Sequence, residues 1–187
     1  MRRVGQDRDV SSDPDGCARA DAPRVVITGF MCAGKTSVAR ELARRLSLPF
    51  LDLDDLVTAR EGRTPQQLID EHGEPAFRDA ETRALRQALK TSDAFILALG
   101  GGAWTFPRNR ALINSYNCLT VWLDAPFELC WERINNETQT RPLARDRARA
   151  RELYDERRAS YSTAELHVRA DADCSAVELA AEVADRL

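Results

Sequence analysis

A short strand, a glycine-containing loop and an amphipathic helix follow one another near the start of this sequence. The stretch Val25-Val26-Ile27-Thr28 is apolar and β-branched, as expected of a buried strand. Residues 29–36, Gly-Phe-Met-Cys-Ala-Gly-Lys-Thr, then match the pattern G-x-x-x-x-G-K-[ST], and residues 37–46 carry apolar side chains at helical spacing. This order of elements predicts a phosphate-binding loop that holds ATP or GTP.

The loop supplies groups that suit phosphate chemistry. Its glycines allow backbone N–H groups to approach phosphates closely. Of the 27 basic residues only Lys35 and Lys90 are lysines, and the compact ammonium of Lys35 fits between phosphate oxygens. The Thr36 hydroxyl is the expected direct ligand of Mg²⁺. The predicted ATP-binding residues of the loop are Cys32, Ala33, Gly34, Lys35, Thr36 and Ser37.

Apolar runs and helical patterns alternate from residue 24 to the end of the chain. This alternation predicts an α/β fold of three layers, α/β/α, with a parallel sheet of five strands covered by helices on both faces. We expect strands at 24–28, 49–53, 94–99, 118–124 and 166–170. Helices are expected at 35–46, 55–61, 65–72, 75–90, 107–114, 126–135, 147–163 and 175–187. Residues 23–187 are predicted to form one domain.

The composition limits the function classes and the compartment. A net charge of −3 at pH 7 and a pI near 5.5 argue against general binding to nucleic acids or membrane surfaces. The five cysteines are scattered without a C-x-x-C pair, which is typical of free thiols in a reducing cytoplasm. Residues 1–22 are polar and lack the apolar core of a secretory signal, so we expect a disordered N-terminal extension.

Two aspartates follow the second expected strand. Asp52 and Asp54 are two residues apart, so the alternation of a strand predicts that both side chains emerge on the same face. Ligands of open parallel sheets bind beyond the carboxyl ends of the strands. Both carboxylates are therefore expected at the ligand site.

A polar, arginine-containing segment at about 135–148 interrupts the regular pattern. Polar loops of this length inside compact domains are uncommon and often functional. In a phosphotransferase we expect a mobile lid that closes over the nucleotide and excludes water. An ordinary solvated connection is the alternative interpretation.

Several motifs in one order resemble the shikimate kinase family, within the nucleoside-monophosphate-kinase-like group. Besides the phosphate-binding loop they are Phe50-Leu51-Asp52-Leu53-Asp54, Phe77-Arg78-Asp79-Ala80-Glu81, Leu99-Gly100-Gly101-Gly102-Ala103, Arg141-Pro142-Leu143, and Arg157 four residues before Tyr161. The resemblance implies a P-loop NTPase fold and an enzyme that transfers the γ-phosphoryl group of ATP to the 3-hydroxyl of shikimate. The product, shikimate 3-phosphate, belongs to chorismate and aromatic amino-acid biosynthesis. Mg²⁺ is implied as cofactor, with ATP as co-substrate, and a monomer is the simplest expectation.

The resemblance implies roles on the acceptor side. Asp54 binds the shikimate hydroxyls and is the candidate catalytic base. Arg78 and Arg157 bind the shikimate carboxylate, for which guanidinium groups are suited, and the backbone of Gly101 contacts shikimate. Glu81, at i+3 from Arg78, could hold that guanidinium; without the resemblance the two would be interpreted as a surface ion pair.

On the nucleotide side the resemblance implies four further roles. Lys35 acts in catalysis at the phosphates, and Arg141 of the lid stabilises charge on the transferring phosphoryl group. Asp52 organises the water ligands of the magnesium ion. Arg133 stacks on the adenine.

Two departures from the family pattern and two other functions stay open. Where the family has Arg-x-Pro-Leu-Tyr, this chain has Arg157-Arg158-Ala159-Ser160-Tyr161, so Arg158 competes with Arg157 for the substrate role. The segment at 170–174 is short and acidic, which leaves the adenine contacts and the preference for ATP over GTP open. The other functions are a gluconate-type sugar-acid kinase and a nucleotide-binding regulatory module without catalysis.

Overall fold

A five-stranded parallel sheet forms the centre of the protein in its computed structural model, which describes residues 24–91, 95–136 and 146–187. The strand order is β2-β3-β1-β4-β5. Val26 of β1 lies opposite Leu97 of β3 on one side and Thr120 of β4 on the other. The strands are β1 (Arg24–Thr28), β2 (Phe50–Asp52), β3 (Phe95–Ala98), β4 (Leu119–Asp124) and β5 (Leu166–Arg169).

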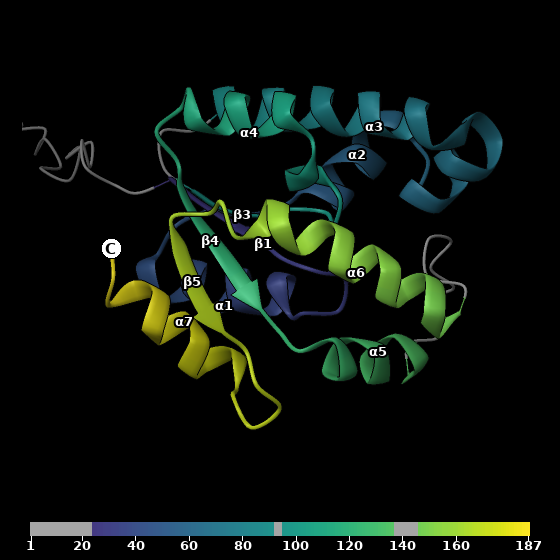
Figure 1. The fold of residues 1–187 in the computed structure, drawn as a ribbon. Coiled ribbons are helices and arrows are strands. Elements are labelled where there is room, and N and C mark those ends of the chain that lie inside the picture. Colours follow the sequence, from purple (N-terminus) through teal and green to yellow (C-terminus); the bar gives the residue numbers. More distant parts are fainter. Residues whose placement is uncertain (1–23, 92–94, 137–145) are drawn as a thin grey trace, which may run out of the picture.

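The central strands are apolar because both of their faces are covered. Val25, Val26 and Ile27 of β1 have no exposed surface, and β3 is buried along its whole length. Continuous apolar runs of this kind are typical of parallel sheets between two layers of helices. Figure 1 shows α1 and α7 together on one side of the sheet, with α3 and α4 on the opposite side.

Seven α-helices and one 3-10 turn are present in the described part of the chain. They are α1 (Lys35–Leu46), α2 (Leu53–Glu61), α3 (Pro65–Thr91), η1 (Ala103–Thr105), α4 (Pro107–Asn114), α5 (Phe127–Asn136), α6 (Arg147–Tyr161) and α7 (Ala176–Ala184). The three-layer α/β/α arrangement around a five-stranded parallel sheet is thereby confirmed.

Most element boundaries agree with the expected ones to within a few residues, but two differ for a physical reason. The helices expected at 65–72 and 75–90 are joined into α3, which contains a break at Gly73 with φ 82° and ψ 164°. Only glycine adopts this backbone conformation readily. The helix expected from Asp55 begins two residues earlier, at Leu53, because the Asp52 side chain accepts a hydrogen bond from the Asp54 N–H and caps it.

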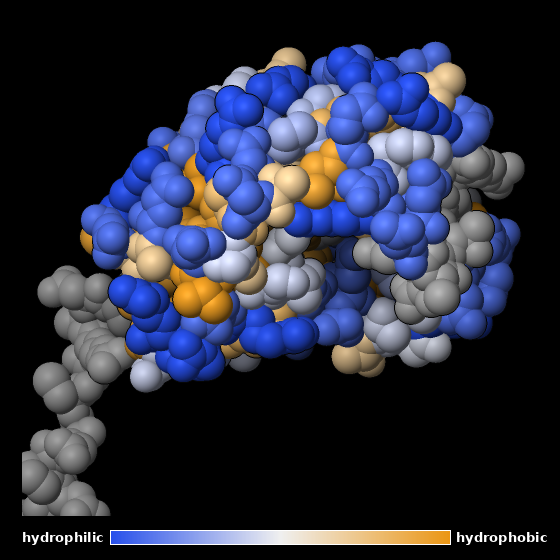
Figure 2. All heavy atoms as spheres, turned by 90° about the horizontal axis from the view of Figure 1, so that it is seen from below, coloured by the Kyte–Doolittle hydropathy of each residue, from blue (hydrophilic) through white to orange (hydrophobic). Residues whose placement is uncertain are grey.

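The surface seen in Figure 2 is largely hydrophilic and carries only small hydrophobic patches. None of the helices in the described ranges is both long and apolar enough to span a membrane. Cys32, Cys118, Cys130 and Cys174 are free thiols, as expected. The extension expected at 1–22, which includes Cys17, and most of the expected lid lie outside the described residues.

Candidate active site

The loop between β1 and α1 has the backbone geometry that phosphate binding requires. Gly29 has φ 142°, and a Cβ at this position would lie 2.6 Å from the carbonyl oxygen of Leu123. Gly34 has φ 99° and stands at the N-cap of α1, where no side chain caps the helix. The first N–H groups of α1 and the positive end of its dipole are therefore directed at the loop.

Lys35 and Thr36 begin α1 and reach into the site. The Lys35 side chain is buried, and its Nζ donates a hydrogen bond of 2.8 Å to the carbonyl oxygen of Phe30 inside the loop. The Thr36 hydroxyl donates to Oδ2 of Asp52 over 2.8 Å. A hydroxyl and a carboxylate from two different elements thus meet at one point of the loop.

This pair of oxygens fits a magnesium ion. Mg²⁺ prefers oxygen ligands, keeps several waters, and is usually held by one or two protein groups together with substrate phosphates. In the described ranges no group of three or more His, Cys, Asp or Glu residues could bind a metal by itself. The residues present therefore suit an ion that arrives with a nucleotide rather than an ion held by the protein alone.

Asp52 and Asp54 do come together, but the strand argument for their juxtaposition was wrong. Asp52 is the last residue of β2 and the N-cap of α2, while Asp54 lies in the first turn of α2. Both carboxylates still face one cleft, because the helix begins at the carboxyl end of the strand. Asp55, the next residue, is exposed to solvent.

One cleft of about 560 Å³ joins the phosphate-binding loop to these aspartates. It lies beyond the carboxyl ends of the parallel strands, where open α/β sheets bind their ligands. Its wall contains Gly100 and Gly101 of the glycine triplet, residues of α5 and residues in the region of α7. The lining includes Cys32, Ala33, Gly34, Lys35, Thr36, Ser37, Asp52, Asp54, Gly100, Gly101, Arg133, Asn136, Ala170, Asp171, Cys174 and Leu179.

The three glycines after β3 leave room for charged side chains. A Cβ on Gly100 would lie 2.8 Å from Oδ1 of Asp54 and 2.9 Å from Oε1 of Glu81. A Cβ on Gly102 would lie 2.5 Å from Nη2 of Arg78. The sequence predicts that the triplet admits a substrate to the backbone, and the structure shows that it also lets two carboxylates and a guanidinium pack directly against it.

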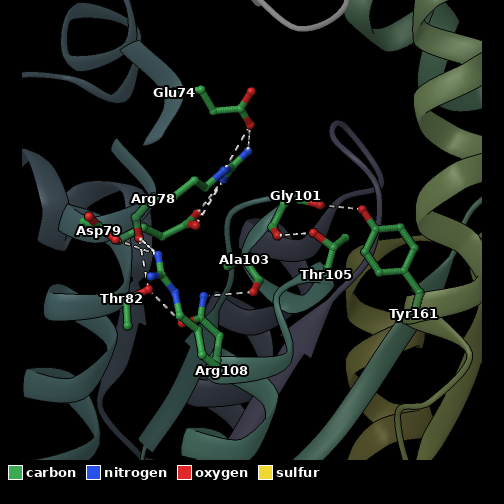
Figure 3. Close-up of polar contacts among 12 residues, drawn as sticks. Glu74, Arg78, Asp79, Thr82, Gly101, Ala103, Thr105, Arg108 and Tyr161 are labelled. Atoms are coloured by element: carbon green, nitrogen blue, oxygen red, sulfur yellow. Dashed lines mark hydrogen bonds and ion pairs between the residues drawn. The ribbon is translucent and has the colours of Figure 1, made fainter. Parts of the chain in front are cut away.

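Arg78 and Glu81 form a buried ion pair rather than a surface pair. The Glu81 side chain has no exposed area and that of Arg78 has 6%, and their closest contact, Nη1 to Oε2, is 3.0 Å. Burial raises the pKa of the Glu81 carboxyl to about 7, although the charge of Arg78 opposes the shift. Glu74, which the sequence interpretation did not include, accepts hydrogen bonds from Nε and Nη2 of Arg78 (Figure 3). The sequence could have predicted this contact, because Glu74 stands four residues before Arg78 and side chains at that spacing meet on a helix.

The two neighbouring arginines of α6 face different parts of the protein. Arg157 is buried, and its Nη1 lies 3.7 Å from where a Cβ on Gly101 would be. Arg158 instead makes two hydrogen bonds of 3.0 Å with the carboxylate of Asp124, outside the cleft. Tyr161, one turn after Arg157, donates a hydrogen bond to the carbonyl oxygen of Gly101 (Figure 3). Only Arg157 of the two is placed beside the glycine triplet.

The opposite end of the cleft lies between α5 and the segment before α7. Arg133 of α5 donates from Nη1 to the carbonyl oxygen of Cys32 over 3.1 Å, so it contacts the phosphate-binding loop itself. Asp171 and Cys174 of the short acidic segment line the same end. Arg141, the arginine expected in the lid, lies outside the described residues.

Comparison with known proteins identifies relatives over most of the chain. The family model for shikimate kinase matches residues 31–187. The shikimate kinase of Salinibacter ruber is 38% identical over 173 residues, which cover 87% of this chain and 83% of the relative. That of Caulobacter vibrioides is 40% identical over 157 residues, with 82% and 77% covered. The structure of shikimate kinase from Acinetobacter baumannii in complex with shikimate superposes with a TM-score of 0.81 at 30% identity, covering 89% of this chain and 93% of that one.

Proposed function

The chain belongs to the shikimate kinase family, and on that premise we propose which of its residues carry the reaction. The protein therefore has shikimate kinase activity, which is the transfer of a phosphoryl group from ATP to shikimate in aromatic amino-acid biosynthesis. One observation supports the assignment of residues above all others. The phosphate-binding loop and the Asp54 carboxylate line the same cleft, so a phosphoryl donor and a hydroxyl acceptor can meet there.

The nucleotide occupies the end of the cleft at the start of α1. The backbone N–H groups of residues 32–37 surround the phosphates, and Lys35 turns from the Phe30 carbonyl to the β- and γ-phosphates. Arg133, beside the loop and on the cleft wall, lies at the adenine end together with Asp171 and Cys174. Arg141 stabilises the transferring phosphoryl group when the lid closes.

Thr36 would hold the magnesium ion directly, and Asp52 would hold it through water. Bound together with ATP, the ion would supply positive charge that neutralises the β- and γ-phosphates. The hydrogen bond between the two side chains positions both oxygens for this task before the nucleotide arrives.

Shikimate occupies the end of the cleft next to the glycine triplet. Asp54 accepts the proton of the attacking 3-hydroxyl, and the Gly101 backbone contacts the ring substituents. Arg78 of α3 and Arg157 of α6 both reach the glycine triplet, and together they bind the shikimate carboxylate. Arg157 is preferred over Arg158, because the Arg158 guanidinium is engaged by Asp124.

The cellular setting follows from the substrates and the thiols. ATP is a cytoplasmic substrate and the described cysteines are free, which supports a cytoplasmic location. Residues 23–187 act as one kinase domain, and a monomer is the simplest proposal for a kinase of this size.

The test is ADP release in a coupled assay with Mg²⁺ and ATP, with and without shikimate. We expect turnover that depends on shikimate, and severe loss of kcat in Asp54→Asn with nucleotide binding retained. Turnover with gluconate but not with shikimate would support the sugar-acid kinase and remove the proposed carboxylate clamp. Binding of ATP without acceptor-dependent ADP release would support the regulatory module.

A further inference from the structure

The guanidinium group of Arg78 is held by two carboxylates at once. Glu81 accepts from Nη1 at 3.0 and 3.2 Å. Glu74 accepts with Oε1 from Nε at 3.1 Å and from Nη2 at 2.9 Å. Figure 3 shows the Glu74 carboxylate directed at this second edge of the guanidinium.

The edge that Glu74 covers is the one through which a carboxylate ligand would bind Arg78 with two hydrogen bonds. A guanidinium has five N–H donors, and its Nε and Nη2 groups form a fork that matches a carboxylate. The Nη1 group is occupied by Glu81, and Gly102 lies against the guanidinium, with its Cβ position 2.8 Å from Cζ. A substrate carboxylate and Glu74 therefore compete for the same donors.

Of the two glutamates, Glu74 is the one that can leave. The Glu81 side chain is fully buried in the middle of α3, whereas that of Glu74 is 44% exposed. Glu74 also follows directly on the break of α3 at Gly73 and precedes Pro75, so its backbone is not fixed by a continuous helix on both sides. Water can solvate the released carboxylate, which keeps the free-energy cost of its displacement small.

We propose that Glu74 is an internal competitor of the substrate: its carboxylate occupies the place on Arg78 that the substrate carboxylate takes, and binding exchanges one for the other. This inference rests on the proposed binding of the shikimate carboxylate by Arg78. The competition lowers the affinity for shikimate and keeps the Arg78 charge paired before the substrate arrives.

Glu74→Gln tests the competition, because the amide keeps the size of the side chain and removes its charge. The Kd for shikimate, measured by titration calorimetry, should decrease about two- to fivefold, the range of a half-exposed ion pair. The control is Glu71→Gln on the same part of α3, which removes the same charge from a side chain of similar exposure (48%) and breaks its ion pair with the exposed Arg63. It should leave the Kd unchanged.

A second variant separates this inference from the function on which it rests. If Arg78→Gln weakens shikimate binding and Glu74→Gln has no further effect in that background, the competition is supported. If Arg78→Gln weakens binding but Glu74→Gln alone leaves the Kd unchanged or raises it, Glu74 positions Arg78 and the inference is overturned. If Arg78→Gln leaves the Kd unchanged, the proposed carboxylate clamp itself fails.

Discussion

Alanine at position 102 should displace the guanidinium of Arg78 and so weaken shikimate binding. Gly102 has φ −106° and ψ −14°, which alanine adopts without strain, so the effect of Gly102→Ala is steric. The new Cβ would lie 2.5 Å from Nη2 and 2.8 Å from Nη1 and Cζ of Arg78. Ordinary contacts between such atoms are about 3.5 Å, so the guanidinium must move by about 1 Å.

The expected rise in the KM for shikimate follows from the hydrogen bond to the substrate that the displaced Arg78 guanidinium can no longer make. Arg78 is buried and held by Glu81 and Glu74, so it cannot move away freely, and overpacking of this kind costs about 1–3 kcal/mol of stability. A lost hydrogen bond to a charged group is worth about 1.5–3 kcal/mol. At 1.36 kcal/mol for each factor of ten, the KM for shikimate should rise about 10- to 150-fold.

The assay is steady-state ADP release at varied shikimate, together with nucleotide binding by calorimetry. Nucleotide affinity should be unchanged, since the three atoms nearest to the new Cβ all belong to Arg78 and not to the phosphate-binding loop. In the Arg78→Gln background the same glycine substitution should alter the KM less than about twofold, because its target is already removed. A folded Gly102→Ala variant with the wild-type KM would refute the view that Arg78 must stay packed against the triplet.

Three further predictions concern other residues of the site and its surroundings. Lys35→Met should lower kcat at least about 100-fold in the ADP assay, and retained activity would remove Lys35 from the mechanism. Arg157→Ala should raise the KM for shikimate about tenfold or more, while Arg158→Ala should mainly lower the Tm; the reverse result would exchange their roles. Burial raises the pKa of Glu81 to about 7 from an unfolded value of 4.5, so the folded protein binds this proton more tightly and stability falls as the pH rises from about 4.5 to 7. In Glu81→Gln the change in Tm between pH 5 and pH 8 should be smaller, and an equal change would contradict the assignment of that pKa.

The sheet, the phosphate-binding loop and most helices could be predicted because their signals are local. An apolar run such as Val25–Thr28 indicates a buried strand wherever it occurs, and the spacing of apolar residues over 37–46 indicates a helix in the same way. Thr36 and Lys35 occupy fixed positions in the loop pattern, so their approach to the cleft followed from the pattern as well. Strand order and the cleft itself arise from packing that such patterns do not contain.

The acceptor side shows where local reasoning fails. Asp54 was predicted at the cleft for the wrong reason, since the Asp52 side chain starts a helix where a strand was expected to continue. Aspartate is favoured at the N-cap of a helix, which would have predicted a helix start at Asp52. The apolar residues before Asp52 instead predicted a strand that continues past it. The i, i+3 spacing of Arg78 and Glu81 says nothing of burial, and burial is what turns an ordinary pair into one with a carboxyl pKa near 7.

Arg157 and Arg158 could not be distinguished from the motif, yet the fold separates them by helix geometry. Successive residues of an α-helix point about 100° apart, so two neighbouring arginines cannot face the same site. The buried face of α6, which contains Leu153, Tyr154, Arg157 and Tyr161, fixes its rotation relative to the sheet, and Arg158 makes its two hydrogen bonds with Asp124 on the exposed side. That rotation directs Arg157 towards the glycine triplet, where Tyr161, one turn later, also bonds Gly101. Arg158 occupies the variable position of the motif, so only the fold distinguishes it from Arg157.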